Sequence, residues 1–184
     1  MNCIKQMEKE ADAARKRVSG YSPEKRANLE AQGRKAISKG DWRVAISLGA
    51  TSRDGLLGEI NRSAPKRNKE DDGSIGDASH SSRVSDHNPN EAGVVCARDF
   101  THDPAGGFDC EKFTAWLRDR VARGLENRVK YLIWNRLIVS GPGQAHPAGL
   151  WRKYTGSNPH TAHCHVSVRL KRQYYDDDSP WGWV

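Results

Sequence analysis

The first forty residues carry few apolar side chains, and these recur at the spacing of a helix. Intervals of three and four residues separate the apolar positions of a first helix, which are Ile4, Met7, Ala11, Ala14 and Val18. So narrow a stripe is too thin to form a core alone and needs a partner surface. After Gly20, Ser22 and Pro23 supply an N-cap and a first-turn proline for a second helix that reaches about Ile37. The pattern therefore predicts a helical hairpin over residues 1–40.

Two further helices are predicted in the remaining part of the chain, residues 41–184. The first, "DGLLGEINRS", ends before Pro65, because proline cannot continue a helix. The second, "DCEKFTAWLRDRVARG", begins with Asp109 as its N-cap and ends at Gly124. Its apolar face is formed by three side chains, those of Phe113, Leu117 and Val121.

Three apolar segments are predicted to be strands. They are "GVVCARDF" (93–100), "VKYLIWNRLIVS" (129–140) and "HCHVSVRL" (163–170). The segment 65–92 is almost free of apolar residues, and so long a loop inside a compact domain is usually functional or disordered. The tryptophans of the final "SPWGWV" are expected to anchor the tail of the chain.

Charge and composition change this picture only in part. The chain has a net charge of +7, and residues 1–40 hold ten Lys and Arg against five Asp and Glu, so that +5 lies in that segment. The basic character is therefore mostly a property of the predicted hairpin, which disfavours nucleic-acid binding by the rest of the chain. Six tryptophans favour a packed fold over disorder.

The expected location follows from the apolar pattern and the cysteines. No stretch approaches the roughly 18 apolar residues of a transmembrane helix. The segment "MNCIKQMEKEADAARKRVSG" contains no apolar core of a secretory signal peptide. We therefore expect a protein made in the cytoplasm without a signal peptide, with no integral membrane segment. The four cysteines form no CxxC pair and are expected to be reduced thiols.

Three of the seven histidines fall close together, at His160, His163 and His165. Side chains alternate between the two faces of a strand, so His163, His165 and Ser167 share one face, while a cysteine and two valines fill the other. Because the apolar set faces the core, both strand histidines point together to a polar face. Such a pair either holds a metal ion, or one histidine holds it while the other handles a proton.

A second cluster lies upstream, where His87 precedes a turn and Asp99 lies on the strand predicted after it. Val95, Ala97 and Asp99 share a face of that strand, so a carboxylate extends a row of small apolar side chains. A lone buried carboxylate is costly unless it is paired or bound to a metal. Two neutral imidazoles, a carboxylate and one open position make a typical catalytic zinc site. A salt bridge between Asp99 and one of the many arginines is the alternative.

The motifs "SDHNPN", "GVVCARDFTHDP" and "NPHTAHCHVSV" resemble those of the D-Ala-D-Ala carboxypeptidase-like zinc peptidases, in particular their phage endolysin branch. The family pattern of S-x-H, A-x-D and H-x-H is matched at residues 85–87, 97–99 and 163–165. The phrases "INRSAP", "DGSIGDASH" and "KYLIWNRLI" are also similar to that branch. The resemblance runs over about residues 42–168 and leaves the predicted hairpin out.

The resemblance implies a zinc site and its chemistry. The ligands of the Zn²⁺ ion would be His87, Asp99 and His165, and His163 would be the catalytic or transition-state-stabilising group. It also implies an α+β fold like that of hedgehog and the DD-peptidases, in which a small antiparallel sheet flanked by helices carries the zinc site. The catalytic domain would span residues 41–184, with the basic hairpin as an N-terminal addition.

Some assignments stay open within this resemblance. Eleven residues separate His87 from Asp99, more than in the better-known members, which leaves His80 as a rival first ligand. An arginine upstream of the first ligand often steadies substrate or oxyanion in the family, and Arg67 and Arg83 are the candidates here. The remaining histidines, expected to support a ligand or to lie at the surface, are His102, His146 and His160.

The implied function is that of a phage endolysin, a zinc peptidase that hydrolyses stem-peptide or crosslink bonds of peptidoglycan. It would act as a monomer, after release to the cell wall through a membrane pore. The alternatives are a virion-associated wall-degrading enzyme that acts at entry, a histidine–metal nuclease, and a non-catalytic wall-binding or virion protein stabilised by a metal. A nuclease is expected to gather basic residues around its site, and a non-catalytic metal site is expected to close with four protein ligands.

Overall fold

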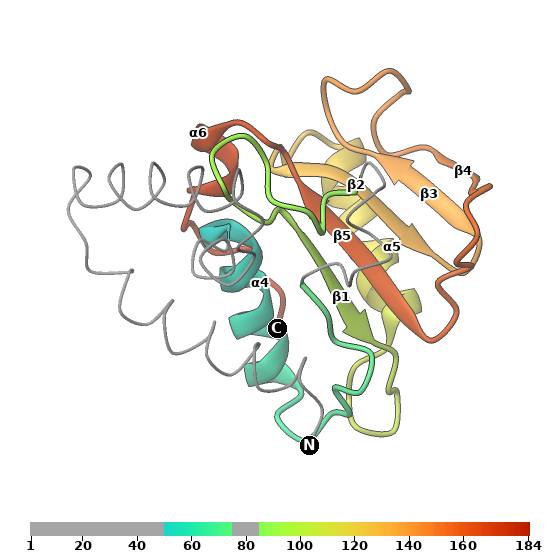
Figure 1. The fold of residues 1–184 in the computed structure, drawn as a ribbon. Helices are drawn as coiled ribbons and strands as arrows, with labels where there is room; N and C mark the ends of the chain where they lie inside the picture. The colour runs from blue at the N-terminus through green and yellow to red at the C-terminus, as the bar shows by residue number, and fades with distance from the viewer. Residues whose placement is uncertain (1–49, 75–84) are drawn as a thin grey trace. The chain divides into compact units, whose positions relative to one another are not determined.

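The computed structural model describes residues 50–74 and 85–184, which Figure 1 draws in colour. The predicted hairpin over residues 1–40 and its boundary near residue 41 lie outside the described residues, as do His80 and Arg83. These assignments therefore stay predictions.

The chain forms two compact units. Of the described residues, the first unit contains Ala50, Ser74 and residues 85–96. The second contains residues 51–73 and 97–184 and is called the sheet unit. The sheet unit holds the helices and strands of the described chain.

The sheet unit is built on a five-stranded sheet in the order β1-β5-β2-β3-β4. Its strands are β1 (Ala97–Thr101), β2 (Val129–Trp134), β3 (Leu137–Ser140), β4 (Trp151–Lys153) and β5 (His163–Val168). All neighbouring strands are antiparallel. The expected α+β class with a small antiparallel sheet is therefore confirmed. β5 lies between β1 and β2, so both of its edges are paired (Figure 1).

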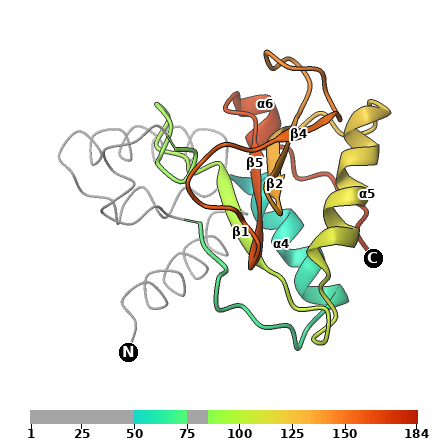
Figure 2. The ribbon, with the colours of Figure 1, turned by 90° about the vertical axis from the view of Figure 1, so that its right-hand side faces the viewer.

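The helices are α4 (Thr51–Ser63), α5 (Cys110–Ala122) and α6 (Arg172–Tyr175). Figure 2 views the sheet nearly edge-on and shows α4 and α5 on the same side of it. Both match predicted helices, and the cap of α5 forms as expected, because the Asp109 carboxylate accepts a hydrogen bond from the Glu111 amide at 2.9 Å. Beyond α5, Gly124 has a φ of 71°, which glycine adopts without strain. Among the described residues, no helix is long and apolar enough to cross a membrane.

Aromatic packing fixes α5 to one face of the sheet. The rings of Phe100, Phe108 and Phe113 are fully buried, with centroids 5.3–6.2 Å apart. Cys164 faces this same core, and burial raises the pKa of its thiol well above the usual range. Phe100 and Cys164 lie opposite each other in the β1–β5 pairing. Side chains alternate along a strand, so the neighbours of Phe100 in β1 and of Cys164 in β5 point to the opposite face.

The predicted strand over residues 129–140 is in fact a hairpin, and the prediction of one continuous strand was wrong. β2 and β3 are joined by Asn135 and Arg136, whose φ angles are 45° and 67°. Two successive positive φ angles are typical of the tight turns that match the twist of a hairpin. The apolar run hides this turn because the dipeptide lacks glycine. Two carbonyls from a distant loop hold it instead, since the amides of Asn135 and Arg136 donate to His160 and Pro159.

Smaller differences concern short elements. β1 begins at Ala97, so the predicted start of this strand near Gly93 was four residues too early. The three-residue β4 and the four-residue α6 were not predicted, because neither is long enough to show a periodic pattern. Three of the four cysteines lie in the described part of the chain, and all three are buried.

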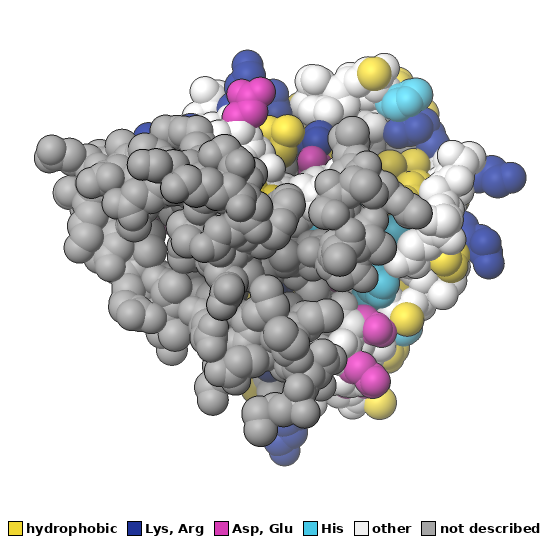
Figure 3. Space-filling model, viewed as in Figure 1, with side chains coloured by type: hydrophobic (Ala, Val, Ile, Leu, Met, Phe, Trp, Pro, Cys, Tyr) yellow, Lys and Arg dark blue, Asp and Glu magenta, His cyan; other side chains and the backbone are white. Residues whose placement is uncertain are grey.

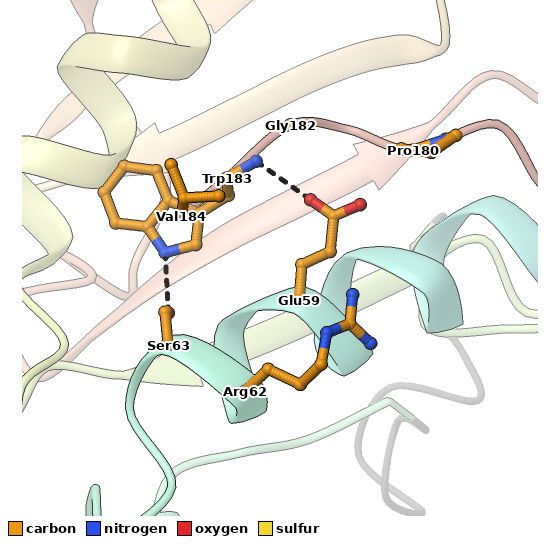
Figure 4. Close-up of a pocket in the computed structure, with 7 residues that line it drawn as sticks. All are labelled: Glu59, Arg62, Ser63, Pro180, Gly182, Trp183 and Val184. Carbon is orange, nitrogen blue, oxygen red and sulfur yellow. Dashed lines mark hydrogen bonds between the residues drawn. The ribbon is translucent and has the colours of Figure 1, made fainter.

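The C-terminal tail is anchored as expected. Trp181 is fully buried, and its backbone and indole N–H groups donate to the Glu59 carboxylate at 2.8 Å and the Ser52 carbonyl at 2.7 Å. The Arg128 guanidinium lies 3.9 Å from the centroid of its ring. Figure 4 shows that Glu59 also accepts a hydrogen bond from the backbone of Trp183, so one carboxylate of α4 clamps two residues of the tail.

Replacing Trp181 with alanine should lower the free energy of unfolding by about 3–5 kcal/mol, because a large buried ring is lost and a cavity remains. Urea unfolding measures this. The control is Leu170→Ala, since Leu170 is 44% exposed and its loss should change stability by no more than about 0.5 kcal/mol. Equal stability of the two variants would contradict the anchoring role.

Candidate metal site

The register of β1 against β5 brings the predicted site residues together. Asp99 lies directly opposite His165, and Thr101 lies opposite His163. Directly opposed residues in antiparallel strands have Cβ atoms about 5 Å apart on the same face. Asp99 and both strand histidines therefore share the polar face, as the alternation in the sequence predicted.

Three neighbouring side chains hold the imidazole of His165. Its Nδ1 lies 2.9 Å from Oδ1 of Asp99, and its Nε2 lies 2.9 Å from the hydroxyl of Ser167. An ionised carboxylate only accepts hydrogen bonds, so Nδ1 donates and Nε2 accepts from the hydroxyl. The ring also stacks on Tyr131, with an interplanar angle of 9°. These contacts fix the orientation of a ring that is only 4% exposed.

His163 has a different environment. Its Nε2 lies 3.9 Å from Oδ2 of Asp99, which is too long for a hydrogen bond. Both ring nitrogens are buried, and neither has a hydrogen-bond partner among the described residues. A buried polar atom left unsatisfied costs about 1–3 kcal/mol. A partner such as water, an ion or substrate would recover that free energy.

His160 joins this cluster from the loop before β5. Its Nδ1 lies 2.8 Å from the Asn158 carbonyl, which only accepts, so Nδ1 carries the proton and Nε2 carries the lone pair. The ring centroid lies 5.1 Å from that of His163 and 5.7 Å from that of His165. Burial, together with the neighbouring His165, lowers the pKa of His160 to about 4. His160 is therefore neutral at pH 7.

Three of these side chains are spaced for a metal ion. Donor atoms of Asp99, His160 and His163 all lie within 4.8 Å of one another. Ligands of one tetrahedral zinc ion, bound at about 2.0–2.2 Å, are about 3.3–3.6 Å apart. The three donors would therefore have to move closer together by as much as about 1 Å to bind one ion.

His87 belongs to the first unit. Its ring is 8% exposed, and Nδ1 lies 3.2 Å from the Ser74 carbonyl, so Nδ1 donates and Nε2 carries the lone pair. Metal-binding histidines usually donate their second ring N–H to such a carbonyl. The predicted ligand set of His87, Asp99 and His165 draws on both units and stays a prediction.

Arg67 is engaged inside the sheet unit. Its guanidinium is buried and donates to both carboxylate oxygens of Asp72, at 2.8 and 2.5 Å. Asp72 in turn accepts hydrogen bonds from the amide and hydroxyl of Thr101 on β1. The carbonyl of the next residue, Gly73, accepts a hydrogen bond from the amide of Asp99 at 2.7 Å. This clamp fixes the edge of β1 that carries Asp99, whereas a contact of Arg67 with substrate stays a prediction.

The two other histidines of the sheet unit do not join the cluster. His102 accepts the amide of Cys110 through Nδ1 at 3.1 Å, and its ring lies against Trp134, with centroids 4.9 Å apart. His146 is exposed, as expected from its loop. Sequence reasoning gave His160 only a supporting role, although its position five residues before His165 was a usable signal.

The surface gives further information on charge. Figure 3 shows histidine side chains at more than one place on the visible face, beside acidic side chains at the centre right and beside Lys or Arg side chains at the upper right.

A hollow lies at the C-terminal tail, between α4 and Trp183 (Figure 4). It measures about 460 Å³ and is open to solvent. The carboxylate in its wall, that of Glu59, is already bonded to two tail amides. No cluster of candidate catalytic or metal-binding side chains lines it, so the histidine cluster is the better candidate site.

Comparison of the chain with models of protein families, with curated proteins and with solved structures finds no match. The function has to be inferred from the motifs of the sequence and from the chemistry of the histidine cluster.

Replacing Arg67 with alanine should lower the free energy of unfolding by about 3–5 kcal/mol, because it leaves the Asp72 carboxylate buried without its cation. Thermal and urea unfolding measure this, with Lys66→Ala as the control because Lys66 is an exposed neighbour. An unchanged stability together with a raised KM for substrate would instead support a substrate-binding arginine.

Proposed function

We propose that this chain is a zinc-dependent peptidoglycan peptidase that hydrolyses stem-peptide or crosslink bonds of the bacterial cell wall, as a phage endolysin does. The observation that carries the proposal is the cluster of one carboxylate and three imidazoles beside the β1–β5 pair. Carboxylate and imidazole donors suit zinc, and the motifs around them resemble those of zinc peptidases.

The proposed ligands are His87, Asp99 and His165, with a fourth position open to water or substrate. A zinc ion bound there supplies Lewis acidity toward the scissile carbonyl and the attacking water. The hydrogen bond from His87 to the Ser74 carbonyl supports its part, because it leaves Nε2 unprotonated. Ligation by His165 would replace one of the two partners that its ring nitrogens now have.

His163 is the proposed catalytic residue. Its ring lies beside Asp99, and its nitrogens are buried without a partner in the described chain. Such a ring can accept a proton from the attacking water and pass it to the leaving amine, or donate a hydrogen bond to the developing oxyanion. The stacking of His165 on Tyr131 keeps the neighbouring part of the site rigid.

The proposed substrate is a wall peptide that contains D-residues, cut by a monomeric enzyme. The enzyme would be made in the host cytoplasm and reach the wall either through a membrane pore or as part of the virion.

A non-catalytic metal site is the second candidate, and one observation favours it. The sheet unit alone offers four possible donors, namely Asp99, His160, His163 and His165. Four protein ligands can close around an ion and leave no position for substrate, as in structural zinc sites. Loss of the metal would then unfold the protein rather than stop a reaction.

The purified full chain should clear a suspension of peptidoglycan, and chelation of the metal should stop the clearing while circular dichroism still shows a fold. Adding zinc back should restore clearing. Plasmid DNA incubated with the same enzyme should stay intact. Clearing that continues in a chelator, after metal analysis confirms that zinc is gone, would contradict the proposal, and chelator-induced unfolding without any prior activity would support the structural site.

Substitution of the two strand histidines should affect different properties, namely zinc binding for His165 and turnover for His163. His165→Ala should lose the zinc, whereas His163→Ala should keep it and lower turnover by roughly 10²-fold, as removal of a general acid–base group does. Zinc content per chain, after dialysis that leaves one tightly bound zinc in the wild type, and turnover on a stem peptide measure this, with the exposed His146→Ala as control. Full zinc in His165→Ala, or equal zinc loss in both variants, would contradict the assigned roles.

A further inference from the structure

We propose that Asp99, His160 and His163 form a second divalent-metal site, separate from the proposed His87–Asp99–His165 site and sharing Asp99 with it. The binding is independent of the proposed function, while its effect on activity rests on that function.

The two oxygens of Asp99 face different histidines. Oδ1 lies 2.9 Å from Nδ1 of His165, whereas Oδ2 lies 3.9 Å from Nε2 of His163. A carboxylate with one oxygen turned toward each histidine has the arrangement of a bridging ligand. In two-metal sites the ions lie about 3.5–4 Å apart, a separation that one bridging carboxylate spans.

His160 is prepared as a metal ligand rather than as a proton carrier. The Asn158 carbonyl holds its Nδ1 proton, and the Asn158 side chain accepts its backbone amide at 3.0 Å. The lone pair therefore sits on Nε2, and a ring nitrogen of His160 lies within 4.8 Å of donor atoms of Asp99 and His163. The ring is 7% exposed, so an ion held by it would be shielded from solvent on that side.

The backbone of His160 supplies an independent observation. Its φ is 52°, a left-handed conformation that is uncommon for a residue other than glycine. Such strain persists only where the surroundings enforce it, and it often marks a ligand clamp. The hydrogen bonds to Asn158 hold this conformation, which presents the ring to His163.

The unsatisfied ring nitrogens of His163 favour binding of an ion by the cluster. Its two buried nitrogens have no partner in the described chain, so coordination of one of them removes an unsatisfied buried group. Two imidazoles and one carboxylate favour Zn²⁺, Co²⁺ or Ni²⁺ over Mg²⁺ and Ca²⁺, which prefer oxygen ligands.

This second ion would regulate the proposed enzyme. An ion bound to His163 occupies the lone pair that the proposed reaction uses for the proton. Metal in excess of one equivalent should therefore inhibit turnover, and the inhibition should depend on His160.

Titration of the metal-free full chain with Co²⁺ tests the binding, with bound metal measured by equilibrium dialysis and by the visible cobalt spectrum. The wild type should bind two ions, one more tightly than the other. His160→Ala should bind one. His160→Asn should behave alike, because asparagine tolerates a positive φ and keeps the fold while its amide is a poor ligand. His146→Ala is the matched control and should bind two.

Variants of the other site make the outcomes distinct. His87→Ala should keep the ion held by His160, and Asp99→Ala should lose both. The proposal would be overturned if both His160 variants still bound two ions. It would also be overturned if the wild type bound only one ion and if both His87→Ala and His160→Asn lost that ion. The ratio of turnover at ten equivalents of zinc to turnover at one should be well below 1 for the wild type and near 1 for His160→Asn. If no variant cuts peptidoglycan under any metal condition, the proposed function fails while the cobalt titration still decides the second site.

Discussion

The site depends on the register of β1 against β5. The pairing of Asp99 with His165 and of Thr101 with His163 puts one carboxylate and two imidazoles on the same face of the sheet. A slip of one residue would turn both histidines toward the helices and bring Cys164 to the polar face. The apolar packing of Phe100 against α5 opposes such a slip, so the core on one side of the sheet fixes the chemistry on the other.

The polar face is supported by the loop at the edge of β1 as well as by the core on the other face of the sheet. The buried pair of Arg67 and Asp72 ties the segment before Gly73 to β1, and Gly73 itself bonds the amide of Asp99. A buried ion pair of this kind contributes little net stability but specifies one arrangement strongly, because breaking it leaves a buried charge. In our account this clamp positions the carboxylate on which both proposed metal sites depend, so its effect on function is indirect.

The sequence alone predicted the features that follow from local periodicity. The alternation along β5 gave the face of each histidine, and the cap at Asp109 and the proline after α4 gave the helix ends. Features held by distant partners were not predicted. The turn at Asn135 depends on carbonyls of the loop before β5. The ion pair of Arg67 with Asp72 depends on the conformation of the loop that contains both residues. His160 enters the cluster through a left-handed backbone conformation that no pattern of residue types reveals.

The central claim is that the polar face of the β1–β5 pair binds a transition metal through the carboxylate of Asp99. Anomalous diffraction at the zinc absorption edge, from crystals of the full chain grown with zinc, tests this most directly. The account predicts an anomalous peak about 2.0–2.2 Å from a carboxylate oxygen of Asp99, with imidazole nitrogens completing the coordination. No peak within bonding distance of Asp99, in crystals whose zinc content is confirmed by fluorescence, would contradict it.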